Sequence, residues 1–224
     1  MNTVIFIGQT LFLSIISLIA LRMGVQAATA YAAVLTLLAN LFVQKQIVLF
    51  GLEATASDAL AIGITLTLNL MQEFYGRKAA RNGLIASFLC AGVYAFLTLF
   101  HLKYQPSPSD SLNVHFIALL AAAPRIIGAS LISFLISGFL DYYLFQIFKK
   151  IFRSRFLFFR NYGSIALSQA VDTLLFSFLG LYGLVSHLGQ IIVVSYAIKS
   201  VALLLTSPAV WFSKKLLHYP TLKL

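Results

Sequence analysis

The sequence predicts an all-α fold: a polytopic integral membrane bundle of seven transmembrane helices. Two observations predict this class. Of the 224 residues, 60% are hydrophobic and only 10% are charged, and the mean hydropathy is +0.93, which is more apolar surface than a soluble domain of this length can bury. In addition, apolar runs long enough to cross a bilayer recur along the chain between short polar or basic segments. The lipid bilayer is therefore the expected solvent.

The first two apolar runs are expected to be transmembrane helices. The run from Val4 to Leu21 resembles a signal peptide followed by a small-residue cleavage site, but no Lys or Arg precedes it and it is long for such a peptide. We expect it to be retained. The second span, 27–50, carries Asn40 one turn deeper than Lys45. Lys45 either reaches the interface or, with Asn40, forms a polar cap over a pocket.

The third run, from Ser57 to Arg81, organises the rest of the chain. At 100° per residue its polar and small residues form one stripe, with Glu73 at the edge. The stripe consists of Asp58, Thr65, Asn69, Gln72 and Gly76. Polar groups on a membrane helix must face protein or water, because lipid leaves them unpaired. We therefore favour a cavity-lining helix over a helix that merely packs through interhelical hydrogen bonds.

Four further spans complete the count of seven: 84–100, 125–148, 162–185 and 187–212. A loop with two prolines is expected at 101–113. Pro124 is expected to split the run 114–150, so that a helix starts at about Arg125. Arg125 then either reaches the membrane interface or lies at the mouth of a site.

Two opposite charges lie at matching depth in the last two spans. Asp172 and Lys199 are both near the predicted midplane, where an isolated charge costs at least about 2.5–3.5 kcal/mol. We expect them to pair, either for structure alone or also to contact a substrate or a proton. Ser168, Gln169 and Phe176 share the side of Asp172, and Tyr196 shares the side of Lys199.

The net charge of +10 is expected to mark cytoplasmic loops rather than a nucleic-acid partner. Twelve of the 16 basic residues fall on one side of the seven predicted spans. This places the C-terminus in the cytoplasm and the N-terminus outside. These residues are Arg22, Arg77, Lys78, Arg81, Lys149, Lys150, Arg153, Arg155, Arg160, Lys214, Lys215 and Lys223.

Motifs of known enzymes are absent from the sequence: it has no HExxH, no P-loop, no G-x-S-x-G and no His pair at ligand spacing. We therefore expect no catalytic residue, no metal site and no cofactor. The remaining features are an aqueous pocket in a helical bundle, lined by polar and charged side chains. They favour a carrier for a polar small molecule.

Several of these residues form a pattern that resembles the VUT family, the bacterial queuosine-precursor transporters. The pattern runs from about 27 to 217 and includes Glu73-Phe74-Tyr75-Gly76-Arg77, Arg125, Ser168-Gln169-x-x-Asp172-Thr173 and Tyr196-x-x-Lys199. The chain departs from it at Asn69, where the family usually has Asp. The resemblance implies a six-helix transporter domain, 27–224, preceded by an extra transmembrane helix, 1–26. It also implies import of queuine or another 7-deazaguanine across the inner membrane for tRNA modification.

A guanine-like substrate offers N–H donors at N1 and N2 and an acceptor at O6. The resemblance then implies Asp172 or Glu73 for the donors, Lys199, Arg125 or Asn40 for the oxygen, and Phe176 or Tyr196 for stacking. The expected substrate-binding residues are Asn40, Asn69, Glu73, Arg125, Gln169, Asp172, Phe176, Tyr196 and Lys199.

Two other classes of function stay open at this point. One is a substrate-binding subunit of an energy-coupling vitamin importer, which would require an ATPase partner. The other is a membrane protein that transports nothing. A homodimer is also left open by the sequence.

Overall fold

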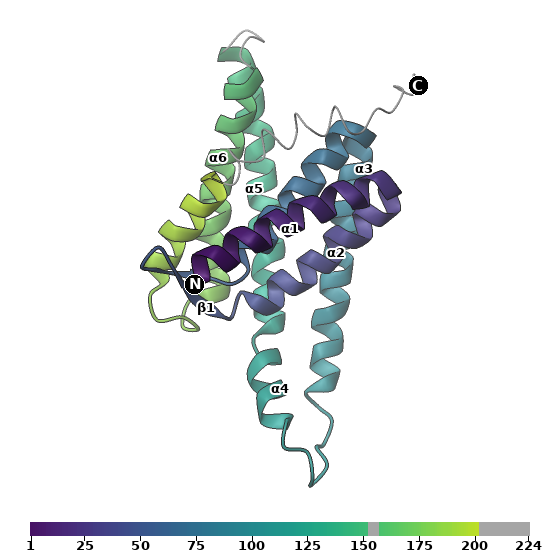
Figure 1. The fold of residues 1–224 in the computed structure, drawn as a ribbon, viewed down its shortest axis with the longest axis vertical. Helices are drawn as coiled ribbons and strands as arrows, with labels where there is room; N and C mark the ends of the chain where they lie inside the picture. Colours follow the sequence, from purple (N-terminus) through teal and green to yellow (C-terminus); the bar gives the residue numbers. More distant parts are fainter. Residues whose placement is uncertain (152–156, 202–224) are drawn as a thin grey trace.

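The computed structural model describes residues 1–151 and 157–201 and shows a helical bundle with one small β-hairpin (Figure 1). Its elements are α1 (Asn2–Met23), α2 (Val25–Phe42), β1 (Gln46–Leu49), β2 (Leu52–Thr55), α3 (Asp58–His101), α4 (Asn113–Leu120), α5 (Ala123–Ile151), α6 (Leu157–Phe176), a π-helical turn (Ser177–Leu181) and a last helix, Leu188–Val201.

The predicted class, a polytopic helical membrane protein, is confirmed. Within the described residues, four helical segments are long and apolar enough to cross a membrane: Asn2–Met23, Val25–Phe42, Lys78–His101 and Asn113–Ser137. Two shorter apolar helices, Ile165–Leu181 and Leu188–Val201, lie in the last third of the chain. The predicted seventh span extends to residue 212, and its part from 202 onwards lies outside the described residues.

The long helix α3 is folded back on itself at Gly76. This glycine has φ 85° and ψ 167°, a combination that essentially only glycine adopts. In a straight helix Met71 and Gly83 would be about 18 Å apart. In the structure a Cβ atom added at Gly83 would lie 2.9 Å from the Met71 side chain. The two arms of α3, 58–75 and 77–101, therefore pack side by side, and the helix expected over 57–81 ends before Gly76.

A second helical hairpin precedes this one. Gly24 separates α1 from α2 and has φ 110° and ψ 176°, the same glycine-specific conformation as Gly76. Leu21 of α1 and Ala28 of α2 are fully buried in one apolar cluster with residues of the first arm of α3. The small Ala28 side chain allows the helices to approach closely. The first predicted span is thus a helix, as expected.

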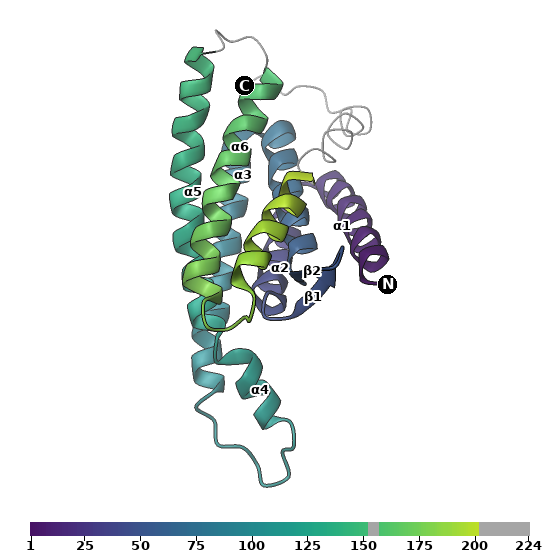
Figure 2. The same cartoon turned by 90° about the vertical axis from the view of Figure 1, so that its left-hand side faces the viewer.

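The β-hairpin replaces the end of the second predicted span, which was expected to be helical to residue 50. β1 and β2 pair antiparallel, with Leu49 opposite Leu52. Phe50 and Gly51 form the turn, both at positive φ (54° and 81°), as tight hairpins require. Leu49 is buried against the last helix. Figure 2 shows the hairpin between that helix and the start of α1.

Pro124 lies in the first turn of α5, where its missing N–H costs no helical hydrogen bond. The predicted break at this proline and the predicted helix from about Arg125 are confirmed. α5 and α6 run side by side (Figure 2). After the π-helical turn the chain reverses at Gly183, with φ 80°, and enters the last helix.

Candidate functional site

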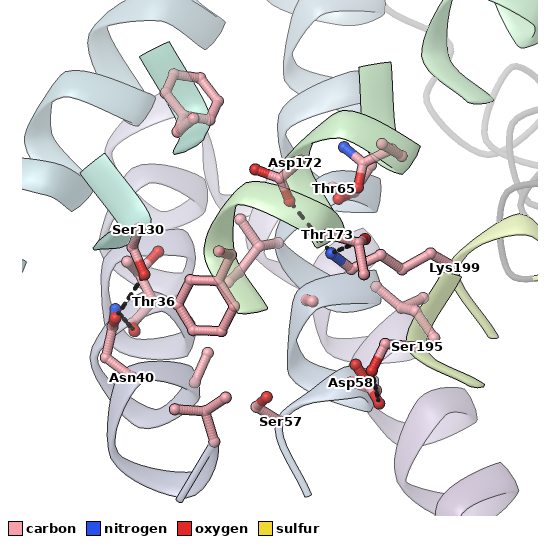
Figure 3. A pocket seen from close by; sticks show the side chains of 18 of the residues that line it. Thr36, Asn40, Ser57, Asp58, Thr65, Ser130, Asp172, Thr173, Ser195 and Lys199 are labelled. Carbon is pink, nitrogen blue, oxygen red and sulfur yellow. Dashed lines mark hydrogen bonds and ion pairs between the residues drawn. The ribbon is translucent and has the colours of Figure 1, made fainter. Parts of the chain in front are cut away.

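A cavity of about 250 Å³ lies inside the bundle (Figure 3). Its walls come from α2, the β2–α3 junction, both arms of α3, α5, α6 and the last helix. The volume is slightly below the roughly 300–1,000 Å³ of typical ligand pockets and suits a compact ligand. Five of the nine predicted site residues line it: Asn40, Gln169, Asp172, Phe176 and Lys199.

The predicted pair of Asp172 and Lys199 is present in this cavity. The Lys199 ammonium donates to Asp172 Oδ2 at 3.2 Å and to Thr173 Oγ1 at 3.1 Å. The side chains of the pair are only 18% and 21% exposed. Ser137 Oγ donates to the other carboxylate oxygen at 3.4 Å. An ammonium has three N–H groups and a carboxylate about four lone pairs, so both groups can still bind a ligand.

Asn40 supplies an amide from the opposite wall. Its Nδ2 donates to the Thr36 carbonyl at 2.8 Å, and its Oδ1 accepts from Ser130 Oγ at 2.9 Å. The bond with Ser130 ties α2 to α5. Together the two bonds fix the orientation of a side chain that is 5% exposed. One N–H and one lone pair of the amide are left for a ligand. Figure 3 shows Asn40 and Ser130 across the cavity from Lys199.

A second carboxylate, Asp58, lines the same cavity and is 3% exposed. Ser195 Oγ of the last helix donates to its Oδ2 at 2.9 Å. Asp58 is on the polar stripe identified in the sequence, but we did not select it as a binding residue. The stripe itself was the signal that could have identified Asp58, because another of its residues, Thr65, also lines the cavity.

The apolar part of the wall contains three phenylalanines among aliphatic side chains. Phe88 and Phe134 have ring centroids 4.8 Å apart with planes at 49°, and both line the cavity together with Phe176. Phe88 and Phe134 were not predicted. The sequence contains 20 phenylalanines, so no signal distinguishes these two. Flat apolar walls of this kind suit an aromatic ring.

Three of the other four predicted site residues, Asn69, Arg125 and Tyr196, do not line this cavity. Arg125 donates from Nε to the Leu179 carbonyl at 2.9 Å and from Nη2 to the Tyr182 carbonyl at 2.7 Å, beside a separate hollow. Tyr196 lies one residue after the cavity-lining Ser195, and Asn69 is exposed. The side chain of Glu73 lies outside the described part of the structure.

Lys45 is exposed and does not line the cavity. The polar cap that it would form with Asn40 is therefore absent, and Asn40 alone reaches the site. Among the described residues, no group of three or more His, Cys, Asp or Glu side chains is arranged to hold a metal ion. The charged groups in the described lining of the cavity are two carboxylates and one ammonium.

Comparisons with known proteins agree with a transport function. The family model described as "Putative vitamin uptake transporter" matches residues 55–212. The "Probable queuosine precursor transporter" of Bacillus subtilis (strain 168) is 33% identical over 186 residues, which is 81% of this chain and 81% of that protein. No solved structure is significantly similar to the chain.

Proposed function

The chain belongs to the family of putative vitamin uptake transporters, and from this premise we propose that it imports a queuosine precursor with a 7-deazaguanine ring. The similar protein of Bacillus subtilis carries the name of a queuosine precursor transporter. The family alone does not define the ligand, so the proposal depends on the chemistry of the cavity.

The arrangement of Asp172 and Lys199 carries the proposal. A guanine-like edge presents N–H groups at N1 and N2 beside the acceptor O6. A carboxylate next to an ammonium is the complementary pattern. Asp172 would accept from N1 and N2, and the remaining N–H of Lys199 would donate to O6. The Lys199 ammonium and Asp172 Oδ2 lie 3.2 Å apart. They are therefore close enough to bind O6 and the adjacent N1–H group of one ring.

The remaining cavity residues suit the rest of such a ring. Phe88, Phe134 and Phe176 would cover its faces. The Asn40 amide offers one donor and one acceptor from the far wall. Gln169 lines the cavity and makes no hydrogen bond to another described residue, so its amide is available. Compared with the prediction from sequence, this assignment keeps five residues and leaves Arg125, Tyr196 and Asn69 outside the contact set.

We also propose that the protein lies in the cytoplasmic membrane with its C-terminus inside and its N-terminus outside. The arrangement of the turns supports this orientation. The turns at Gly24 and Gly76, which adjoin the basic residues Arg22 and Lys78, lie toward one end of the bundle (Figure 1). The N-terminus, the β-hairpin and the loop before α4 lie toward the other. That α1 is an addition to a six-helix transporter domain stays a prediction.

Uptake by the purified protein in liposomes tests the proposal. Initial uptake of labelled queuine, 7-cyano-7-deazaguanine and 7-aminomethyl-7-deazaguanine is compared with uptake of adenine, which lacks O6 and the N1–H donor. We expect at least one deazaguanine to enter and adenine to be excluded. Asp110→Asn, in the exposed loop before α4, is the control that should transport normally. Absence of uptake of all three deazaguanines would refute the proposal, and uptake only with an added ATPase partner would favour an energy-coupling importer.

A further inference from the structure

Asp58 is a buried carboxylate without an ion-pair partner in the described part of the chain. It is 3% exposed, and Ser195 Oγ, of a residue that is itself 6% exposed, donates a hydrogen bond to its Oδ2. Thr55 also hydrogen-bonds to this carboxylate. The ammonium of Lys199 is paired with Asp172 instead and acts on Asp58 only through its field. The ionised form of a carboxylate buried in this way is stabilised by a positive charge beside it, because an uncompensated buried charge is costly.

Three hydroxyl groups surround this carboxylate in the cavity wall. Thr55 Oγ1 and Ser57 Oγ are hydrogen-bonded to each other at 3.0 Å, and Ser195 Oγ bonds to Asp58. All four side chains line the cavity, and each is less than a tenth exposed. Ser195 donates to Asp58, one of the Thr55 and Ser57 hydroxyls donates to the other, and all three oxygens keep acceptor lone pairs. The cluster of Thr55, Ser57, Asp58 and Ser195, which we call the Asp58 cluster, therefore offers oxygen acceptors suited to a cation.

The charges of the whole cavity lead to the same conclusion. Its described lining contains two carboxylates, Asp58 and Asp172, and one ammonium, Lys199. With all three ionised the net charge is −1. A neutral ligand leaves this charge uncompensated, whereas a ligand with one positive charge makes the occupied cavity neutral. The cavity is thus complementary to a singly charged cation.

The order of the charged groups indicates where the cation of the ligand would lie. Figure 3 shows Asp172, the Lys199 ammonium and Asp58 following one another along one side of the cavity. Along one edge of a 7-deazaguanine ring the N1 and N2 donors, O6 and the substituent on carbon 7 follow in the same sequence. If Asp172 and Lys199 bind the first two, the substituent on carbon 7 reaches the Asp58 cluster.

We propose that the Asp58 cluster binds a protonated amine attached to carbon 7, so that the transporter selects amine-bearing 7-deazaguanines over neutral ones. This inference rests on the proposed function. An alkylamine, like a lysine side chain, is protonated at neutral pH, with a pKa of about 10. It would donate charge-assisted hydrogen bonds to Asp58 and to the hydroxyls of Thr55 and Ser57. A nitrile on carbon 7 has neither a charge nor an N–H group.

Binding to the purified full-length protein tests this by calorimetry. The ligands are 7-aminomethyl-7-deazaguanine and 7-cyano-7-deazaguanine, which share the ring and differ in the charge on carbon 7. We expect wild type to bind the amine at least about tenfold more tightly, the lower bound for a hydrogen bond to a charged group. Asp58→Asn should bring the two affinities to within about twofold by weakening the amine alone. Asp110→Asn should leave the preference unchanged.

A second variant and a change of salt make the result of this experiment unambiguous. Thr55→Val retains the carboxylate and should lower the preference by about three- to tenfold, which tests the site if Asp58→Asn does not fold. Measurements in sodium chloride and in choline chloride separate a substrate amine from a sodium ion. Sodium-dependent binding of the nitrile would overturn the proposal, as would equal wild-type affinities or an equal loss of both ligands in Asp58→Asn. In all of these cases binding of at least one deazaguanine still supports the proposed function. If neither ligand binds, that function is refuted.

Discussion

The Lys199 ammonium lies 3.2 Å from Asp172 Oδ2, on a helix 27 residues further along the chain. Thr173, adjacent to the aspartate, accepts a second hydrogen bond from the same ammonium at 3.1 Å. The last helix is thus fixed to α6 at the cavity wall by charged groups. Asp172 and Lys199 also line the cavity. The pair therefore serves both the packing of the two helices and the proposed recognition of the substrate.

The first prediction separates these two roles. Asp172→Asn leaves the Lys199 charge without its partner and should destabilise the protein by about 1–3 kcal/mol, between the values for exposed and for fully buried pairs. Asp172→Asn combined with Lys199→Gln removes both charges and should restore the apparent unfolding temperature in detergent. It should not restore deazaguanine uptake into liposomes. Full recovery of uptake by the double variant would reduce the pair to a structural role.

The second prediction concerns the reversal of α3. Gly76→Ala places a Cβ atom on a residue with φ 85° and ψ 167°, which should cost about 1–3 kcal/mol and lower the unfolding temperature. Gly92→Ala is the matched control, because its Cβ would meet nothing within 4 Å and its φ is ordinary. It should be neutral or stabilising by up to about 1 kcal/mol. Equal unfolding temperatures for the two variants would contradict the hairpin at Gly76.

The sequence predicted the class of fold because apolar length and hydropathy suffice to identify membrane helices. It did not predict the β-hairpin, since the short apolar run 47–50 is compatible with either a helix or a strand. The reversal at Gly76 was missed for a different reason. The helical projection placed Gly76 on the polar stripe, whereas its function is to adopt a backbone conformation that other residues avoid.

The site was predictable where charge alone limits the possibilities. Asp172 and Lys199 were assigned correctly as a pair because isolated charges at mid-membrane are too costly. Asn69 was assigned from the polar stripe, and it does share a helical face with Asp58. A stripe identifies one face of a helix but not which part of that face meets a cavity. The cavity extends along α3 from Asp58 to Leu68, yet the next residue, Asn69, is exposed.

The third prediction is the orientation in the membrane. A reporter fused after Leu224 should be cytoplasmic, and one inserted near Pro108 should be outside. The reason is that twelve of the 16 basic residues fall on the same side of the membrane as the C-terminus when seven spans are drawn. Paired reporters of the alkaline-phosphatase and fluorescent-protein type give opposite signals on the two sides. If both positions report the same side, the seven-span assignment is wrong.

The last prediction concerns Arg125, which was expected either to reach the membrane interface or to lie at the mouth of a site. In the structure its guanidinium joins the start of α5 to the Leu179 and Tyr182 carbonyls, where the π-helical turn ends. Two carbonyls bound through two different guanidinium nitrogens require the planar fork of arginine, which lysine lacks. Arg125→Lys and Arg125→Ala should therefore both lower the unfolding temperature, by the equivalent of about 1–2 kcal/mol for this exposed group.

Transport kinetics distinguish this positioning role from direct contact with the substrate. If Arg125 only holds the π-helical turn that follows α6, Arg125→Lys should reduce the maximal uptake rate and leave the ratio of affinities for the amine- and nitrile-bearing deazaguanines unchanged. Lys103→Ala, which removes a cation from the exposed loop before α4 without touching the α6 end, is the control and should behave as wild type. A changed affinity ratio with an unaltered unfolding temperature would place Arg125 in contact with the substrate, because a group that only braces the fold cannot discriminate between two ligands that share one ring.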